Sequence, residues 1–358
     1  MPTTRTLVLA ATAGLTITTG LAHAQFVTAI TRPVFSQGPT TVYSVDAASG
    51  VSTAIFDPIA QGLPATAPGF TGLAADDANR ILYASTTNGT KSDIYALDYT
   101  DPENVTATLL FSTSRDNGGS VVPGPVIDGL AFDTTRRILY GTRVLGGSTG
   151  AEALWRISLT DGFAEVAFEY EPTSTSFYTI GGIDYDAGTD RIYLSDDDDT
   201  GGRNIYSMDA GDLASGLTLV APYPAGVTDV DGVGAGGGFL LLLSDSQDSA
   251  STATVEGNNG LHRLYNLTTG EVTTIESPYP ERTLATLGRI DPTGGGAYAP
   301  SLLGGPACPA CAADFDQSGG VDGDDITAFF NAWQAGEACG DVDGSGGVDG
   351  DDIPFFFV

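Results

Sequence analysis

The sequence predicts a mainly β protein, a five-bladed β-propeller followed by a small α-helical module. A two-part strand repeat recurs through most of the chain. Its second part begins at residues 42, 94, 154, 205 and 264, which are 52, 60, 51 and 59 residues apart. The last 50 or so residues then contain two near-identical acidic loops that a propeller would not need.

Residues 1–24 have the pattern of a secretory signal peptide. Arg5 precedes an apolar stretch from Leu7 to Leu21, and Ala22-His23-Ala24 offers a small-x-small cleavage site. No other segment has the roughly 18 uninterrupted apolar residues that a membrane span needs. We therefore expect an exported protein, extracellular or at the cell surface. Residues 25–305 would form the propeller and residues 306–358 the module.

Each repeat starts with a strand of small and apolar residues, a polar turn and a second strand. These strand pairs begin at Thr71 and Arg80, Asp128 and Arg137, Gly182 and Arg191, in a degenerate copy at Asp231 and Phe239, and finally at Leu287 and Ala297. A second element follows, in which an aromatic residue succeeds an aliphatic one: Val42-Tyr43, Ile94-Tyr95, Leu154-Trp155, Ile205-Tyr206 and Leu264-Tyr265.

Four short strands in roughly 50–60 residues make one propeller blade. Because the chain opens with a second element and ends with a first element, we expect its final strands to complete the opening blade and close the ring. Six blades are the alternative if residues 26–38 form strands of their own. A pair of β-sandwiches would leave the repeat unexplained.

The propeller segment has few residues for nucleophilic or metal chemistry. His262 is its one histidine and lies beside Leu264-Tyr265, where a surface or packing role is expected, and the segment has no cysteine. A Ser-His-Asp hydrolase, a cysteine nucleophile and a His-rich zinc centre are therefore disfavoured. The stretch Gly232–Gly238 has no Lys, Ser or Thr to hold a phosphate, so we interpret it as a tight turn.

Carboxylates are the remaining candidates for catalysis in the propeller segment, and paired carboxylates perform glycoside hydrolysis. The position before the innermost strand should lie near the mouth of the central channel. It is occupied in turn by Thr71, Asp128, Gly181, Asp231 and Leu287, with Asp184 and Asp229 close by in sequence. Any active or ligand site is expected there, although turn capping is the role we favour for these acids. The run Asp196–Asp199 is interpreted as a solvated loop tip in preference to a calcium site.

The two acidic loops run from Asp314 to Asp325 and from Asp341 to Asp352. Side-chain oxygens at positions 1, 3, 5, 9 and 12 suit Ca²⁺, position 7 offers a backbone carbonyl, and glycine at position 6 allows the turn. Position 12 is Asp where the usual motif has Glu. The predicted ligands of two calcium ions are Asp314, Asp316, Ser318, Gly320, Asp322 and Asp325, and Asp341, Asp343, Ser345, Gly347, Asp349 and Asp352.

A helix should follow each loop. After the first loop, Ile326, Phe329, Phe330 and Trp333 fall on one helical face, and Gly336 is a stop signal. After the second, Pro354 lies in the first turn and the stripe repeats at Ile353, Phe356 and Phe357 before Val358. The second helix is therefore shorter, which indicates a truncated sequence or a weaker second copy.

A duplicated calcium loop with one helix after each copy resembles the dockerin module, in its Gly/Asp-rich variety with the pattern DxDxSGGVDGDD. The resemblance covers roughly residues 308–358. It implies a module that folds on calcium and docks a cohesin-like partner. Positions 10 and 11 of each loop would help to select that partner, and they are Gly323-Asp324 and Gly350-Asp351. The identical copies would allow docking through either half. A calcium-stabilised tail without a partner is the alternative.

Charge and cysteines fit an exported protein. With 45 acidic residues against 14 Lys and Arg, the formal net charge is −31, which makes nucleic acid a poor partner. The three cysteines, Cys308, Cys311 and Cys339, lie in or beside the module, and in an oxidising compartment a disulfide is expected, with its pairing open.

Two functions follow. The one we favour is a secreted, non-catalytic propeller that binds a glycan or a protein and is anchored to a complex or surface by its calcium-dependent tail. The alternative is a dockerin-bearing glycoside hydrolase, or another glycan-degrading enzyme, with a carboxylate pair in the propeller funnel.

Overall fold

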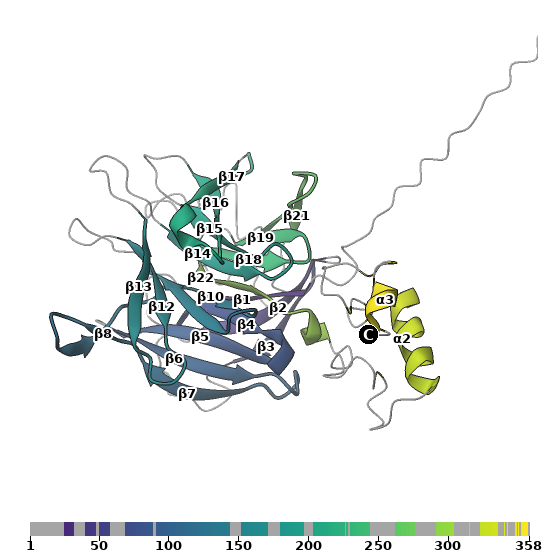
Figure 1. The fold of residues 1–358 in the computed structure, drawn as a ribbon, viewed down its shortest axis with the longest axis horizontal. Helices are drawn as coiled ribbons and strands as arrows, with labels where there is room; N and C mark the ends of the chain where they lie inside the picture. Colours follow the sequence, from purple (N-terminus) through teal and green to yellow (C-terminus); the bar gives the residue numbers. More distant parts are fainter. Residues whose placement is uncertain are drawn as a thin grey trace, which may run out of the picture.

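The fold was analysed in a computed structural model. It describes residues 25–31, 40–47, 50–57, 69–88, 91–143, 152–170, 180–196, 203–225, 227, 230–243, 262–275, 291–303, 315, 323–335, 340, 342, 348, 350 and 352–356. These residues contain five four-stranded antiparallel sheets, the blades of a β-propeller (Figure 1). The five-bladed prediction is confirmed.

Each blade has four strands, from an innermost strand at the centre of the ring to an outermost strand at its edge. The first has β22 (Asp291–Tyr298), β1 (Gln25–Thr31), β2 (Thr40–Asp46) and β3 (Ser52–Phe56). The second has β4 (Phe70–Asp76), β5 (Ile81–Asn88), β6 (Lys91–Asp98) and β7 (Thr106–Ser112). The third has β10 (Gly129–Asp133), β11 (Ile138–Thr142), β12 (Ala153–Ile157) and β13 (Ala164–Glu169).

The fourth blade has β14 (Ile180–Asp186), β15 (Arg191–Asp196), β16 (Asn204–Asp209) and β17 (Thr218–Pro222). The fifth has β18 (Gly232–Gly236), β19 (Phe239–Leu243), β20 (His262–Asn266) and β21 (Val272–Ile275). A separate hairpin of β8 (Ser114–Asp116) and β9 (Val121–Pro123) joins the second blade to the third. Short 3₁₀ turns lie at Asp77–Asn79 (η1), Leu213–Ser215 (η2) and Pro300–Leu303 (η3).

The ring closes through strands from opposite ends of the sequence. Strand β22 pairs antiparallel with β1, with Phe26 opposite Tyr298 and Val27 opposite Ala297. The expected closure is therefore confirmed. The six-blade alternative is wrong, because residues 25–31 join the first blade as its second strand. Ala297 does not begin a strand of its own either, since it lies inside the innermost strand β22.

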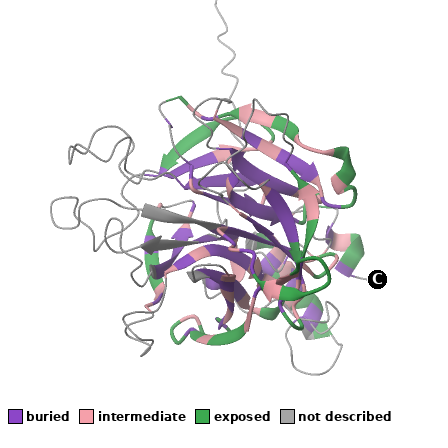
Figure 2. Cartoon of the chain, turned by 90° about the vertical axis from the view of Figure 1, so that its left-hand side faces the viewer, coloured by how far each residue is buried: buried purple, intermediate pink, exposed green. Residues whose placement is uncertain are grey.

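Backbones of neighbouring inner strands pack directly against one another. A Cβ added at Gly72 would lie 2.5 Å from the carbonyl oxygen of Asp128, and one at Gly182 would lie 2.5 Å from Cα of Gly232. Real Cβ atoms do not approach so closely, so these positions admit only glycine without a backbone shift. Figure 2 shows buried residues concentrated in the inner strands and exposed residues along the outer ones.

The stretch Gly232–Gly238 was predicted to be a tight turn, and this is only partly right. Residues Gly232–Gly236 form the innermost strand β18, while Gly237 and Gly238 have positive φ and make the turn that follows it. Glycine here serves close strand packing, because a Cβ at Gly236 would lie 2.2 Å from the ring of Tyr298.

The inner strands of three blades end in a buried aspartate that holds the next turn. Asp76 accepts from the Asn79 amide at 2.9 Å, Asp133 from the Arg136 backbone N–H at 2.8 Å, and Asp186 from the Thr189 hydroxyl at 2.7 Å. Each carboxylate satisfies donors of its own turn, which is how aspartate stabilises turns. This accounts for the aspartate that ends the first strand of these repeats.

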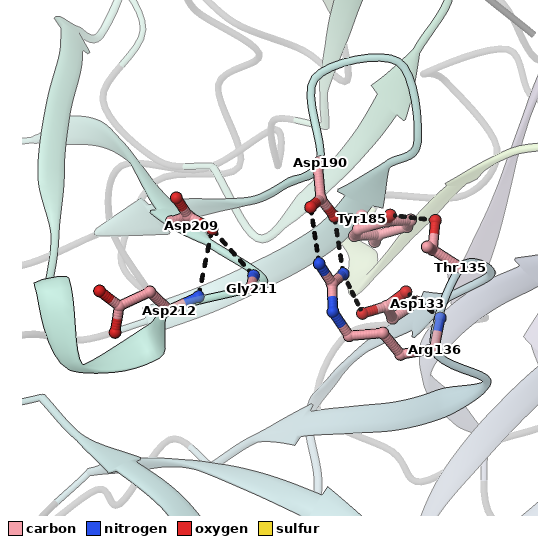
Figure 3. Close-up of polar contacts among 8 residues, drawn as sticks. All are labelled: Asp133, Thr135, Arg136, Tyr185, Asp190, Asp209, Gly211 and Asp212. Atoms are coloured by element: carbon pink, nitrogen blue, oxygen red, sulfur yellow. Dashed lines mark hydrogen bonds and ion pairs between the residues drawn. The ribbon is translucent and has the colours of Figure 1, made fainter.

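Ion pairs connect the third blade to its neighbours on this same end of the propeller. The Arg136 guanidinium binds Asp133 at 2.9 Å in its own blade and Asp190 at 2.6 Å in the fourth blade, as Figure 3 shows. Arg137 binds the buried Asp76 of the second blade at 2.7 Å. We call this end of the propeller, where the inner strands finish, the turn face.

His262 is fully buried as the first residue of β20, in agreement with a packing role. Burial, and to a lesser degree the charge of Arg263, lowers the pKa of His262 from 6.5 to about 3. The folded protein therefore keeps this imidazole neutral at a pH where the unfolded chain protonates it.

This histidine predicts a pH dependence of stability. Between pH 6.5 and about pH 3 the unfolded state binds the extra proton, so stability should fall with falling pH by up to about 1.4 kcal/mol per unit. Urea unfolding of the wild type and His262→Gln at several pH values in this range measures it. The variant should lose stability less steeply, and equal slopes would contradict the assignment.

Two helices follow the propeller: α2 (Gly323–Ala335) and α3 (Asp352–Phe356). Helix α2 ends one residue before Gly336, the predicted stop, and Pro354 lies in the first turn of α3. Phe329 and Phe356 are buried and Phe330, Trp333 and Ile353 partly so, but Ile326 is 41% exposed, so its predicted inward position is wrong. Phe357 lies outside the described residues.

Candidate functional site

The inner strands begin at the end of the propeller opposite the turn face, and we call this end the mouth. Asp128 and Asp231 hold equivalent positions there, since the backbone N–H of Asp128 donates to Thr142 O at 2.9 Å and that of Asp231 donates to Leu243 O at 3.0 Å. The predicted placement of these two acids directly before inner strands is therefore confirmed. Leu287 and Asp229 lie outside the described residues.

Asp128 and Asp231 precede the inner strands of two blades that are not neighbours in the ring. Strand β14 packs between β10, which follows Asp128, and β18, which follows Asp231. Thr71 instead reaches the neighbouring blade, because its hydroxyl donates to Ile127 O at 2.9 Å. At Gly181 the backbone of Asp231 approaches, with its carbonyl oxygen 3.2 Å from an added Cβ.

Asp184, the third acid considered for the mouth, is a structural residue of the ring interior. Its side chain is buried, and its carboxylate accepts from the N–H groups of Tyr185 at 2.9 Å, Ala235 at 2.7 Å and Tyr298 at 3.3 Å. Burial raises the pKa of Asp184 well above its usual value, against the lowering effect of the three N–H donors. Asp184 thus ties the fourth blade to the fifth and first.

Sequence reasoning missed Arg143, which follows β11 at the mouth and neighbours Asp128. Burial and the charge of Arg115 lower the pKa of Arg143, while Asp128 acts in the opposite direction. The corresponding residues are Thr86 in the second blade and Asp196 in the fourth. The available signal was a cation at a repeat position that elsewhere holds a hydroxyl or a carboxylate.

Asp196 itself corrects a prediction. The run Asp196–Asp199 was interpreted as a solvated loop tip, but Asp196 is the last residue of β15 and only 1% exposed. The strand therefore continues one residue into the acidic run. The remaining acids of the run lie outside the described residues.

A surface hollow of about 330 Å³ lies on the outer part of the third blade, away from the mouth. Arg137, Arg156, Ile157, Phe163 and Glu165 are among the residues that line it. Its charged groups are already paired, Arg137 with Asp76 and Arg156 with Glu165. We therefore do not assign it a ligand.

Of the twelve predicted calcium ligands, the structure describes Asp325 and Asp352, which hold position 12 in the two loops. Both are buried, at 1% and 0% exposure. The other ten ligands, and all three cysteines, lie outside the described residues. Within the described part of the chain no three His, Cys, Asp or Glu residues gather to hold a metal ion.

Helices α2 and α3, which contain these two acids, pack against each other through equivalent residues. Phe329 and Phe356 occupy the same position in their respective copies, and their rings stack with centroids 4.2 Å apart and an interplanar angle of 5°. Phe315, from the first loop, packs edge-on against both rings. The two copies thus share one apolar cluster.

The chain leaves the propeller at the turn face. Ser301, in η3, donates its hydroxyl to Asp77 at 2.7 Å, and the Tyr99 hydroxyl donates to the same carboxylate at 2.6 Å. Figure 1 shows α2 and α3 beyond this end and the β8–β9 hairpin on the other side of the propeller. No helix among the described residues is long and apolar enough to span a membrane.

The sequence matches no model of a known protein family and no curated protein. Among solved structures, a chain of the nidogen/laminin complex is similar with a TM-score of 0.44 and 12% identity over 77% of this chain and 98% of that chain. TolB from Acinetobacter baumannii gives 0.45 and 10% identity, over 78% of this chain and 67% of that one.

A GH43 glycoside hydrolase gives a TM-score of 0.44 and 9% identity over 72% of this chain and 51% of that chain. With TM-scores below 0.5, none of these similarities supports an inference about activity or partners. The propeller assignment rests on the sheet topology of this chain itself.

Proposed function

We propose that this is a secreted, non-catalytic propeller that binds a glycan or protein at its mouth and is anchored through a dockerin-like tail. The tail would hold two Ca²⁺ ions in the loops 314–325 and 341–352 and dock a cohesin-like protein. The stacking of Phe329 on Phe356 is the observation that carries this proposal, because it joins equivalent residues of the two copies.

Two further features support a paired calcium module. Position 12 of each loop, Asp325 and Asp352, is buried, and a carboxylate is removed from water only when cations or hydrogen-bond donors compensate it. The duplicated loops are also dominated by acids, so without counter-ions their charges would repel one another.

The position of the tail suits an anchoring role. Because Ser301 is held at the turn face, the tail departs from the end opposite the mouth. A partner bound to the tail would then leave the mouth open to a second ligand.

The test uses the full secreted chain with Ca²⁺ and a panel of immobilised polysaccharides, scoring both retention of the protein and release of reducing ends. Retention without release is expected. Release of reducing ends would instead establish the glycan-degrading alternative, and Asp128→Asn and Asp231→Asn would then be assayed. Neither retention nor release would leave a protein as the ligand.

A further inference from the structure

The outer strands of four blades share an irregularity that the described part of the fifth blade lacks. In each of the first four blades the outer strand carries one extra residue opposite the same point of its neighbour, which makes a β-bulge. The extra residues are Ile55, Leu110, Ala167 and Val220. Strand β21 of the fifth blade instead pairs with β20 without a register shift from Val272 to Ile275.

Bulges protect the edge of a sheet, because they disrupt the row of backbone groups to which a foreign strand could bind. Proline and charged side chains have the same effect, and β17 ends in Pro222 while β13 contains Glu165 and Glu169. Strand β21 has the sequence Val-Thr-Thr-Ile, without proline or charge and with a β-branched residue at every position. Among the described outer strands, β21 is therefore the one best suited to accept another strand.

The register of the β20–β21 hairpin shows which backbone groups face this edge. The Asn266 N–H donates to Glu271 O at 2.9 Å, so these two residues form a hydrogen-bonded pair. Hydrogen-bonded and non-hydrogen-bonded pairs alternate along an antiparallel ladder, which places Val272 and Thr274 in non-hydrogen-bonded pairs. Their N–H and C=O groups therefore point away from β20. No described strand pairs with β21 on that side.

Strand β21 is both accessible and held in place. Val272 is 38% exposed, and Thr273 and Thr274 are exposed as well. Ile275 is buried and packs in an apolar cluster with Leu264 of the same blade and Val45 of the first blade. Because the strand is already fixed in its extended form, it loses little conformational entropy when it binds a partner.

The charge of the protein indicates what kind of strand can bind. Glu271 directly precedes β21 and is exposed. A second copy of this chain would bring another net charge of −31 to the contact, so repulsion opposes self-pairing. A strand with a basic residue opposite Glu271 is attracted instead.

We propose that the open edge of β21 binds an extended segment of a partner protein, which adds a fifth strand to the fifth blade and carries a basic residue beside Glu271. Main-chain hydrogen bonds to Val272 and Thr274 supply affinity, and the charge pair supplies selectivity. This edge belongs to an outermost strand, so the inference depends neither on the ligand proposed for the mouth nor on calcium.

The experiment measures binding of the full chain to immobilised, end-blocked peptides by biolayer interferometry, in about 0.15 M salt to screen the net charge of the protein. The probe is Lys-Val-Thr-Val-Thr-Lys, which places a lysine near Glu271 in either strand direction. Glu-Val-Thr-Val-Thr-Glu reverses the charge. Lys-Val-Pro-Val-Pro-Lys keeps the charge but lacks two main-chain N–H donors, so it separates strand addition from simple attraction between opposite charges.

Three variants locate the binding on β21. Thr274→Pro removes an outward N–H and should abolish binding of the lysine probe. Glu271→Lys should reverse the preference, so that the glutamate peptide binds about tenfold more tightly than the lysine probe. Glu169→Lys, on the outer strand of the third blade, is the matched control and should bind like the wild type. Melting temperatures check that each variant is folded, and Glu271→Lys decides the result if Thr274→Pro is not.

The wild type should bind the lysine probe more tightly than either other peptide. Equal binding of the proline peptide would show charge attraction alone and would overturn the inference. It would also be overturned by unchanged binding to folded Thr274→Pro, by an unchanged preference in Glu271→Lys, or by absence of binding to all three peptides. A wild-type dimer in sedimentation that Thr274→Pro dissociates would show that a second copy, and not a partner protein, occupies the edge.

Discussion

Replacing Asp184 with alanine should lower the free energy of unfolding by about 3–5 kcal/mol, because it leaves buried N–H groups without their acceptor. Ala235 and Tyr298 donate to this carboxylate from the inner strands of the fifth and first blades. The lost hydrogen bonds join three blades, so a rearrangement within one blade cannot replace them. Urea unfolding of the full chain, followed by intrinsic fluorescence, measures the effect.

Two further variants serve as controls for Asp184→Ala. Asp184→Asn keeps one carbonyl oxygen as an acceptor and should be affected less than the alanine variant. Glu271→Ala removes an exposed carboxylate between two strands of the fifth blade and should change stability by less than about 0.5 kcal/mol. If Asp184→Ala matched Glu271→Ala, the proposed role of Asp184 in joining the blades would be wrong.

Removal of calcium is expected to unfold the C-terminal helices while the propeller stays folded. Under the proposed function the two ions supply much of the folding free energy of residues 306–358. Trp333 packs in the apolar cluster of the two copies and reports on it once Trp155 is replaced by Phe. EDTA should shift its emission to longer wavelength and remove helical circular dichroism, and Ca²⁺ should restore both.

Ligand variants make the calcium test specific. Asp314→Ala with Asp341→Ala should abolish the response to Ca²⁺, and either substitution alone should halve the number of bound ions from the two proposed. Asp351→Asn is the control, because position 11 of the loop is not a predicted ligand. The calcium proposal would be refuted if EDTA left the Trp333 emission unchanged, or if the double variant still responded to Ca²⁺.

The repeat made the propeller predictable, because equivalent residues of each blade occupy equivalent places. Tyr83, Tyr140 and Tyr193 all lie opposite the same position of an inner strand. Closure of the ring was also predictable, since the order of elements at the two ends of the chain demanded it. Helical periodicity located α2, but it could not show which edge of the apolar stripe would face solvent, so Ile326 was misplaced.

The ring interior and the mouth were less predictable, because important residues there depart from the repeat. Asp184 stands where other blades have Ala74 and Ala131, and an acid at a small-residue position was a signal that went unused. The β8–β9 hairpin between the second and third blades has no counterpart among the other described blades, so comparison of the repeats could not predict it.

Closure of the ring by β22 makes assembly of the first blade wait until that strand has been synthesised. Strand β1 emerges early during synthesis but keeps an unpaired edge until Tyr298 meets Phe26, some 270 residues later. Bringing such distant segments together costs about 5 kcal/mol of chain entropy, so the first blade should be completed last. A nascent or prematurely ended chain would expose this open edge, which proteases and chaperones can recognise as unfinished.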